Sequence, residues 1–401
     1  MRFCEFLSNM GDPAPQCPEC GAAMKNQGKR GKGIVSLLGE GVVSRNYFVC
    51  ETPGCGCHAI PKDKALGIAG TSFSPGVRRV AAKLAACDSF ESSSDTMSEL
   101  CGVYVSSKDI ERIAHAAGGD VESGKQAQIE KTLTSVDMPR PAAKMPIMYI
   151  EYDGTGVPVM KSETAGRQGK QEDGTAKTRE AKLGCIFTQT ALDKDGNPIR
   201  DKGSTTYFGA IETSGSFSRR LYMEAVDRDV ASAEKVVVIG DGAKWIWNAA
   251  DDNFPEAIQI VDLYHAKEHL WEFIRAVFPG ADKQAEAKQD WYPLLDEGNI
   301  QKLTHEMSMF VPGDEKSEKD LLREVNYFKE NAHRMKYADF IKQGLFVGSG
   351  VIEAGCKNVI GKRLKQSGMH WSVRGANAII ALRCELLSGK SRLVGKGSRV
   401  A

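Results

Sequence analysis

An alternation of apolar, β-prone runs with amphipathic stretches between residues 146 and 280 constrains the fold of this chain more than any other feature. Three strands are predicted first, over PIMYIEYD, KLGCIFTQTAL and TTYFGAIE, with GNP marking a turn among them. Helix, strand, helix, strand and helix are then predicted over SRRLYMEAVDRDVASAE, KVVVIGD, AKWIWNAADDNF, AIQIVDLYH and HLWEFIRAVF. The order β-β-β-α-β-α-β predicts an α/β core.

Three acidic residues occur in motifs tied to this pattern. They are Asp153 in YIEYDGTGVPV, Asp241 in VVVIGDGAKWIWNAA and Glu353 in FVGSGVIEAGCKNVIGKRLKQSGMHWS. The element order is that of an RNase H-like core, whose first and fourth strands are neighbours, so Asp153 and Asp241 should converge at the ends of those strands. Glu353 opens a predicted helix. Two strand-end acids and a helix-borne acid can hold two Mg²⁺ (or Mn²⁺) ions, which stabilise the attacking and leaving oxygens in phosphoryl transfer.

Each acid also has a purely structural interpretation. Asp153 and Asp241 precede glycines, and aspartate often closes such turns through its side chain. Glu353 can complement the dipole of a helix capped by Ser349 or Gly350 and pair with Lys357 one turn later. The predicted convergence of Asp153 with Asp241 favours a metal site over two separate turns. Glu151 shares a strand face with Asp153 and is either an accessory acid or, more in keeping with its position, a packing residue.

Several residues have supporting or alternative interpretations. Asp262 and His265, in DLYH at the end of a predicted strand, are expected to brace the site through a buried hydrogen bond, which we favour over direct metal binding by His265. Trp271 and Trp291 could insert against a flipped base, but we favour the interpretation that each packs in the core. The glycines of FVGSGVIEAG do not form a dinucleotide fingerprint, because no βαβ unit follows them.

Five of the eleven cysteines fall between residues 17 and 57. Cys17 and Cys20 form CPECG, a β-alternating stretch follows, and Cys50 and Cys55 form a second pair. Two cysteine pairs on tight turns suit one structural Zn²⁺ in a zinc ribbon. Cys57 and His58 compete with Cys50 and Cys55 for the second pair of positions, and buried free thiols are the alternative. Thiol clustering without a secretory or membrane segment predicts a reducing, cytoplasmic location.

Residues 63–145 are predicted to be helical and to end in a proline-containing linker, VDMPRPAAKMP. MSELCGVYVSSKDIERIAHAAGG predicts a helix, a turn with a glycine, and a second helix capped by Ser106 or Ser107. This spacing fits a DNA-binding helix-turn-helix and equally a plain helical hairpin. Residues 281–340, rich in Lys and Glu, predict a helical insertion.

The net charge of +1 conceals a basic carboxyl-terminal segment. From residue 356 to 401 there are ten Lys or Arg residues and one acid. Such a run is often only a solvated helix face, but here it begins beside a predicted phosphoryl-transfer acid, which favours contact with a nucleic-acid backbone. The predicted DNA-binding residues are Lys357, Lys362, Arg363, Lys365, Trp371 and Arg374, with Trp371 either stacking on a base or packing.

The blocks YDGTGVPV, GDGAKWIWN, DLYHAKEHLW and GSGVIEAGCKNVIGKRLKQSGMHWS resemble those of ISKra-type insertion-sequence transposases, and CPECG with CGCHAIP resembles the zinc-ribbon start of that family. The resemblance covers residues 15–390 and implies a DDE transposase in which Asp153, Asp241 and Glu353 are the catalytic acids. Two departures are the C-x4-C second cysteine pair, where C-x2-C is usual, and the absence of a longer helical arm before the ribbon, which suggests a shortened copy.

These observations predict a DNA transposase with five parts. They are a zinc-ribbon-like module (1–62), a helical DNA-binding segment and linker (63–145), the first part of an RNase H-like core (146–280), a helical insertion (281–340), and a segment with the Glu353 helix and basic residues (341–401). The expected partner is double-stranded DNA, at element ends and target, bound by a homo-oligomer at the prokaryotic nucleoid and not at a membrane. The rival hypotheses are a decayed or domesticated DNA-binding derivative and an RNase H-like nuclease without strand transfer.

Overall fold

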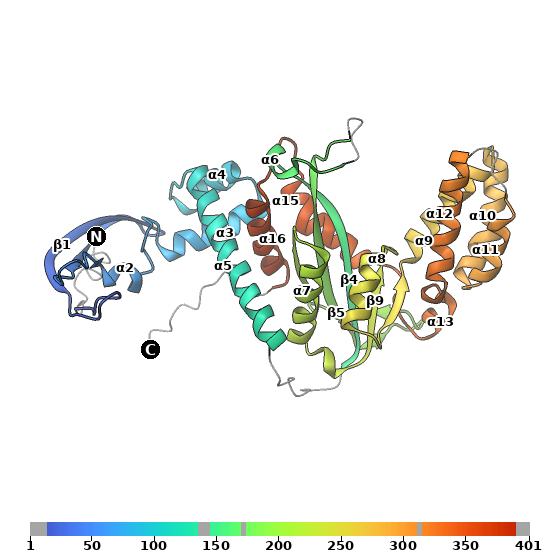
Figure 1. The fold of residues 1–401 in the computed structure, drawn as a ribbon, viewed down its shortest axis with the longest axis horizontal. Coiled ribbons are helices and arrows are strands. Elements are labelled where there is room, and N and C mark those ends of the chain that lie inside the picture. Colours follow the sequence, from blue (N-terminus) through green and yellow to red (C-terminus); the bar gives the residue numbers. More distant parts are fainter. Residues whose placement is uncertain (1–13, 135–144, 170–173, 311–314, 390–401) are drawn as a thin grey trace. The chain divides into compact units, whose positions relative to one another are not determined.

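The structure, a computed structural model, describes residues 14–134, 145–169, 174–310 and 315–389. The chain forms two compact units, one as far as Gly119 and one from Asp120 on. Figure 1 shows the elements of each. None of the helices in these described ranges is long and apolar enough to cross a membrane.

The first unit begins with a small antiparallel sheet. Strand β1 (Lys25–Ser36) pairs with β2 (Gly39–Val49), and β2 pairs with the short β3 (His58–Ala59). Gly39, at φ +105°, occupies the left-handed backbone region in the turn between β1 and β2. Phe48 on β2 packs against Cys17 and Cys50, so one end of the sheet is closed by the cysteine module.

Four helices follow in the chain, α2 (Pro61–Ala65), α3 (Pro75–Cys87), α4 (Phe90–Cys101) and α5 (Ser107–Thr134). Helix α4 ends at Gly102, which is left-handed at φ 63°. The Ser106 hydroxyl accepts the N–H of Asp109 at 3.2 Å, as expected of a capping serine. The predicted helix, glycine turn and second helix are therefore confirmed, although α5 has 28 residues and contains the boundary between the two units. Most of the predicted linker lies outside the described residues.

The second unit is built on a mixed five-stranded sheet in the order β10-β9-β4-β5-β8. Its strands are β4 (Met145–Pro158), β5 (Thr178–Gln189), β8 (Thr206–Ala210), β9 (Ala233–Gly240) and β10 (Ile258–Val261). β4 pairs antiparallel with β5, and β5 with β8, whereas β9 is parallel to both β4 and β10. The predicted α/β core, with its first and fourth strands side by side, is confirmed.

Side chains of β4 alternate between the two faces of the sheet. Tyr152 contacts Phe217 of α7 (Ser214–Asp227), and its hydroxyl donates to the Ile246 carbonyl of α8 (Lys244–Asn253) at 2.6 Å. Glu151 points the other way, toward α14 (Gly350–Gly355). Figure 1 shows α7 and α8 beside the sheet. One face of β4 thus packs against α7 and α8, and the other contacts α14, which carries Glu353.

Two predicted strand ends are wrong. β4 continues past Asp153 to Pro158, because β5 stays paired with it throughout. The strand predicted to include DLYH stops at Val261, and Asp262 instead caps α9 (Leu263–Val277) by accepting the N–H of His265. Aspartate is among the preferred residues at a helix start, which explains why the strand ends there.

The predicted helical segment 281–340 is helical in its described part. It contains α10 (Ala281–Asp296), α11 (Ile300–Ser308), α12 (Glu315–Asn331) and α13 (Tyr337–Lys342), with α10 and α12 packed against α9. Beyond α14 the chain forms a π-helix, η3 (Cys356–Gly361), and then α15 (Lys362–Leu364) and α16 (Val373–Leu387). The remaining short elements are α6 (Lys161–Thr164), β6 (Ala191–Leu192), β7 (Pro198–Ile199), η1 (Val230–Ser232) and η2 (Ala332–Arg334).

Candidate functional site

Parallel pairing of β4 with β9 brings Asp153 and Asp241 to one end of the sheet. The register pairs Glu151 with Ile239, and Asp241 follows β9 directly, so Asp241 comes level with Asp153. Burial raises the pKa of the Asp153 carboxyl, and the nearby Asp241 charge raises it further. A cation between two such carboxylates would offset this repulsion.

Both carboxylates also make the local hydrogen bonds that their turn positions suggested. The Ala243 N–H donates to Oδ1 of Asp241 at 2.9 Å, and the Gly154 N–H donates to Oδ1 of Asp153 at 2.6 Å. The thiol of Cys356, on η3, lies 3.6 Å from Oδ2 of Asp153. The two backbone bonds use only Oδ1, so Oδ2 of each carboxylate takes no part in the turn.

Glu353 groups with Asp262 and His265 rather than directly with the strand-end pair. Ligand atoms of these three side chains lie within 4.8 Å of one another, and Asp153 and Asp241 are not part of that group. His265 interacts with both sets, because it lowers the pKa of Asp153 and its own pKa is raised in part by Asp241. Asp153 and Asp241 therefore form a pair near His265, and Glu353 lies close to His265 as part of a separate group.

Asp262 is the buried brace of this group. It is 0% exposed, accepts the N–H of His265 at 2.8 Å and also accepts the N–H of Ser349. The Ser349 hydroxyl in turn donates to Oε1 of Glu353 at 3.1 Å. Hydrogen bonding to Asp262 raises the pKa of His265 to about 9. The DLYH motif thus joins the start of α9 to the loop that presents Glu353.

Glu151 has a larger structural role than the sequence suggested. It is 0% exposed, and its Oε2 accepts the N–H of Ile352 at 2.9 Å. Burial raises the pKa of this carboxyl to about 8. An acid inside an apolar strand, on the face of Asp153, was the available signal. Its bond fixes the first turn of α14 on β4 and so sets where Glu353 lies.

Four of the predicted DNA-binding residues are exposed on the segment after Glu353. They are Lys357, Lys362, Lys365 and Arg374. The ammonium of Lys365 donates to the Thr155 hydroxyl at 2.6 Å. Thr155 is two residues beyond Asp153 on β4, so this cation lies close to the strand-end acids.

The other two predicted DNA-binding residues are buried, which corrects the expectation that they reach a DNA backbone. Arg363 is 0% and Trp371 is 7% exposed. The Arg363 guanidinium lies 5.0 Å from the centre of the Trp371 ring, and the indole N–H of Trp371 donates to the Leu364 carbonyl at 3.1 Å. Both side chains hold the turn between α15 and α16 in place, because cation–π and hydrogen-bond contacts are strongest away from water.

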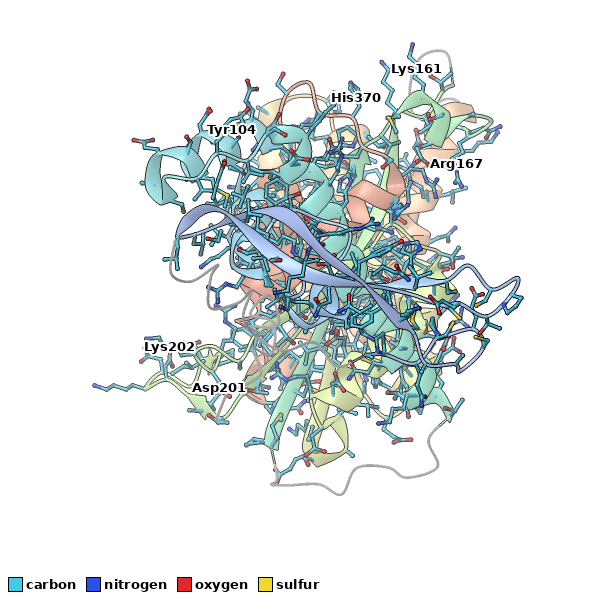
Figure 2. All side chains as sticks on the ribbon, turned by 90° about the vertical axis from the view of Figure 1, so that its left-hand side faces the viewer. Tyr104, Lys161, Arg167, Asp201, Lys202 and His370 are labelled. Carbon is cyan, nitrogen blue, oxygen red and sulfur yellow. The ribbon has the colours of Figure 1, made fainter. Side chains whose placement is uncertain are left out.

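Three exposed basic residues outside the predicted set extend the basic surface. Lys161 and Arg167 follow β4, and His370 precedes Trp371. The Met160 N–H donates to the Trp371 carbonyl at 2.9 Å, which joins the two segments. Figure 2 shows all three side chains at the same end of the second unit. Sequence reasoning missed them because more than 200 positions separate the segments, as the numbering from Arg167 to His370 shows.

The first unit brings four cysteine thiols together. Ligand atoms of Cys17, Cys20, Cys50 and Cys55 lie within 4.8 Å of one another. Cys17 and Cys55 sulfurs are 3.5 Å apart, as are those of Cys20 and Cys50. Tetrahedral Zn²⁺ with Zn–S bonds of about 2.3 Å separates its sulfurs by about 3.8 Å, so the group can hold a metal ion with little movement. A hydrogen bond with Thr52 lowers the pKa of Cys20 to about 6, which favours the thiolate that binds metal.

The competing ligands of the second cysteine pair have other positions. Cys57 accepts the N–H of Cys50 with its carbonyl at 2.8 Å, and its thiol groups with Glu19 and Cys55 instead. His58 lies in β3, opposite Val49, and its ring is 5.8 Å from that of Tyr47. Cys50 and Cys55 are therefore the members that complete the four-thiol group.

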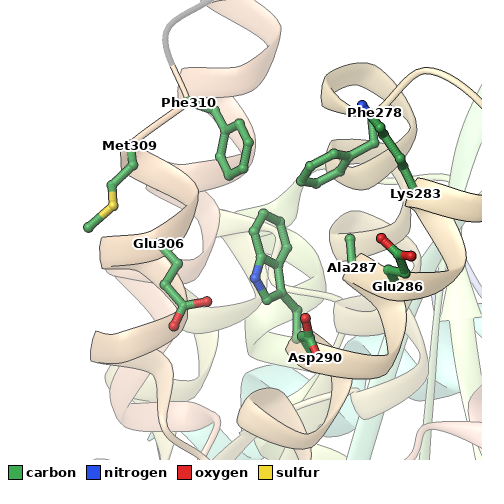
Figure 3. Close-up of a pocket in the computed structure, with 9 residues that line it drawn as sticks. Phe278, Lys283, Glu286, Ala287, Asp290, Glu306, Met309 and Phe310 are labelled. Atoms are coloured by element: carbon green, nitrogen blue, oxygen red, sulfur yellow. The ribbon is translucent and has the colours of Figure 1, made fainter.

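A cavity of about 510 Å³ is lined by residues of the helical segment and the end of α9, and none of Asp153, Asp241 and Glu353 lines it. Figure 3 shows its walls, which combine Phe278 and Phe310 with Met309 and the acids Glu286, Asp290 and Glu306. Trp291 also lines the cavity and is only 6% exposed, packed against Phe273 and Phe278. The preference for core packing over base contact at Trp291 agrees with this burial.

A family model described as "Uncharacterised protein family (UPF0236)" matches residues 23–398. The chain belongs to this family. A comparison of this UPF0236 chain with curated proteins gives no match. Among solved structures it is similar to the "Drosophila P element transposase strand transfer complex", at 8% identity and a TM-score of 0.34, over 83% of this chain and 96% of that chain.

The matched range of the UPF0236 model contains the acidic group and most of the basic segment, but begins after Cys17 and Cys20. Chemically, the second unit of this UPF0236 chain presents carboxylates and a histidine near exposed cations. Such a set can bind divalent cations and phosphate groups.

Proposed function

We propose that this UPF0236 chain is a DNA transposase of the ISKra-like insertion-sequence kind, with an RNase H-like core. The order and direction of the strands carry the proposal. On one side of β4, β5 pairs antiparallel with β4 and β8 pairs antiparallel with β5. On the other side, β9 is parallel to β4 and β10 is parallel to β9. This is the arrangement expected of an RNase H-like core, and it sets Asp153 beside Asp241.

The donor set suits hard divalent cations, which take carboxylate oxygens. Asp153, Asp241 and Glu353 would hold Mg²⁺ or Mn²⁺, and the bound ions would stabilise charge on the attacking and leaving oxygens of a phosphodiester. The raised pKa of Asp153 supports the assignment, because burial and the Asp241 charge are the conditions that a cation relieves. We assign Asp262 and His265 to support, since Asp262 holds the loop before Glu353.

The remaining residues would bind and orient double-stranded DNA. Lys357, Lys362, Lys365 and Arg374 would contact phosphates next to the acids, with Lys161, Arg167 and His370 extending that surface. In the first unit, the four-thiol module with a structural Zn²⁺ and the α4–α5 hairpin would contact element ends. We further propose that the protein acts as a homo-oligomer on element ends and target, at the nucleoid in a prokaryotic cytoplasm.

The test is cleavage and joining of labelled DNA that carries the flanking ends of the element, with Mg²⁺ or Mn²⁺. We expect the parent to cut and join these ends, and Asp153→Ala and Asp241→Ala to lose both products. Asp252→Ala, an exposed acid on α8, is the matched control and should behave like the parent.

The outcomes separate the rival functions. Cutting without joined products would indicate a nuclease of the same fold. Tight, salt-sensitive DNA binding by parent and variants, with no cutting by any of them, would indicate a DNA-binding derivative and contradict the proposed chemistry.

A further inference from the structure

Two tyrosines of the helical segment reach the ends of the two neighbouring parallel strands. The Tyr327 hydroxyl, from α12, donates to the Asp241 carbonyl just after β9 at 3.0 Å. The Tyr337 hydroxyl, from α13, donates to the Val261 carbonyl at the end of β10 at 3.0 Å. The helical segment is therefore bonded to the backbone at Asp241 and immediately before Asp262.

The Tyr327 ring also shapes the turn that follows Asp241. Gly242 has φ +102°, and a Cβ at this position would lie 2.5 Å from Cε2 of Tyr327. The ring therefore fits against the bare backbone of a residue that must be glycine, both for its positive φ and for the missing Cβ. Hydroxyl and ring together restrict the Asp241–Gly242 turn from one side.

Tyr327 is itself held rigidly. Its ring stacks on His269 of α9, with centroids 3.9 Å apart at an angle of 25°. Nδ1 of His269 lies 2.6 Å from Oε2 of Glu324, which is 4% exposed and also accepts hydrogen bonds from Arg323 at 2.9 and 3.1 Å. Residues of α9 and α12 thus fix the ring on the side away from Gly242.

We propose that Tyr327 is a positioning residue, which fixes the Asp241–Gly242 turn so that α12 sets the geometry in which the Asp241 carboxylate binds a divalent cation. The inference rests on the proposed function, because it takes Asp241 as a metal ligand. It assigns the helical segment a role in the metal site in addition to any contact with DNA.

The test is Mn²⁺ binding by the full-length chain, with free Mn²⁺ measured by electron paramagnetic resonance. The proteins compared are the parent, Tyr327→Phe, Asp241→Asn and the control Tyr292→Phe. Tyr292 is a suitable control, because it also lies in the helical segment and its hydroxyl donates to a backbone carbonyl of α9, that of Lys267 at 3.2 Å. Loss of one hydrogen bond is expected to weaken Mn²⁺ binding by Tyr327→Phe about three- to tenfold, and Tyr292→Phe should match the parent. Cleavage at saturating Mn²⁺ should return to the parental rate in Tyr327→Phe.

The outcomes distinguish this inference from the proposed function. Parental Mn²⁺ affinity in Tyr327→Phe, with binding lost in Asp241→Asn, would overturn the inference and leave the proposed function standing. Parental affinity in Asp241→Asn would overturn both. Should Tyr327→Phe fail to fold, Tyr327→Leu also removes the hydroxyl that bonds to the Asp241 carbonyl; weakened Mn²⁺ binding supports the proposal, and parental binding overturns it.

Discussion

Glu151 and Asp153 show how two acids on one strand face acquire different roles. Glu151 is fully buried and bonded to the backbone of α14, whereas Asp153 is half-buried beside Asp241. The difference arises because the pairing of β4 with β9 ends before Asp153, although β4 and β5 remain paired there. Two residues of strand therefore separate a structural carboxyl from a proposed metal ligand.

Substitution of Glu151 should test its structural role. Glu151→Ala removes the acceptor of the Ile352 N–H and leaves a cavity, so we expect a loss of about 2–4 kcal/mol in the free energy of unfolding. Glu151→Gln keeps a carbonyl acceptor of similar shape and should lose about 1 kcal/mol or less. Urea denaturation followed by circular dichroism measures both. Equal losses in the two variants would show that the hydrogen bond contributes little.

At the scale of elements, the helical turn after α14 explains why an α-helical period wrongly predicts that Arg363 is exposed. The π-helical turn over Cys356–Gly361 winds more residues per turn than an α-helix. Residues after it are therefore rotated away from the positions that an α-helical period predicts. This rotation accounts for buried Arg363 lying among exposed Lys357, Lys362 and Lys365.

The cysteine turns form another such element and lead to a prediction about metal content. We expect one Zn²⁺ per chain, lost in Cys17→Ser and Cys55→Ser and retained in Cys57→Ser, because only the first two thiols belong to the four-thiol group. Atomic absorption of purified protein measures the stoichiometry. Chelation of the parent should lower its thermal stability, since the energy of binding a structural zinc contributes to folding. Loss of zinc in Cys57→Ser would contradict the assignment.

A charged contact between α5 and α7 leads to a prediction about stability. Arg220 is 2% exposed and donates to Glu212 at 2.8 Å and to Glu122 at 2.5 Å. Arg220→Leu leaves both carboxylates without their shared partner, so we expect a loss of about 3 kcal/mol in unfolding free energy at pH 7. Lys302→Ala, at an exposed pair with Glu306, should cost about 1 kcal/mol or less.

The same contact should depend on pH. Burial alone would raise the pKa of Glu122, but the Arg220 guanidinium outweighs it and holds that pKa below its ordinary value of 4.5. A lowered carboxyl pKa stabilises the fold at higher pH, and this contribution is lost as the pH falls through the folded-state pKa. The stability difference between parent and Arg220→Leu should therefore shrink below pH 4.5. A constant difference between pH 7 and pH 3 would contradict the ionic origin.

At the scale of the whole molecule, the described residues of the first unit include the four-thiol group, and those of the second include the group of Asp262, His265 and Glu353. The thiol group suits a soft-ligand structural ion, and the carboxylate group suits hard catalytic ions. The exposed basic residues near the acids complete a surface suited to a phosphate backbone. Together these features fit the proposed transposase, in which one unit contributes to recognition and the other performs the chemistry.

The salt dependence of DNA binding tests the role of the basic surface. The triple variant Lys357→Ala, Lys362→Ala, Lys365→Ala should reduce the slope of log K against log salt concentration by up to about 2.7, since each phosphate contact contributes about 0.9. Arg363→Ala should leave the slope unchanged and lower thermal stability instead, because its side chain is buried. Fluorescence anisotropy with labelled DNA gives both slopes. An unchanged slope in the triple variant would place the DNA elsewhere.

The sequence by itself determined the elements of this fold. The order of strands and helices, the Ser106 cap and the Gly102 helix end follow from residues within a few positions of one another. Local hydrogen bonds and hydrophobic periodicity govern such features, and both can be read from a short window.

Only the tertiary structure decided which distant side chains meet. Asp262 holds the Ser349 loop across 87 positions, Glu151 bonds Ile352 across 201, and Tyr327 reaches Asp241 across 86. The π-helical turn, the burial of Arg363 and the choice of Cys55 over Cys57 depend on the same long-range packing. These contacts form when the sheet and helices close around one core, and no local preference along the chain specifies them.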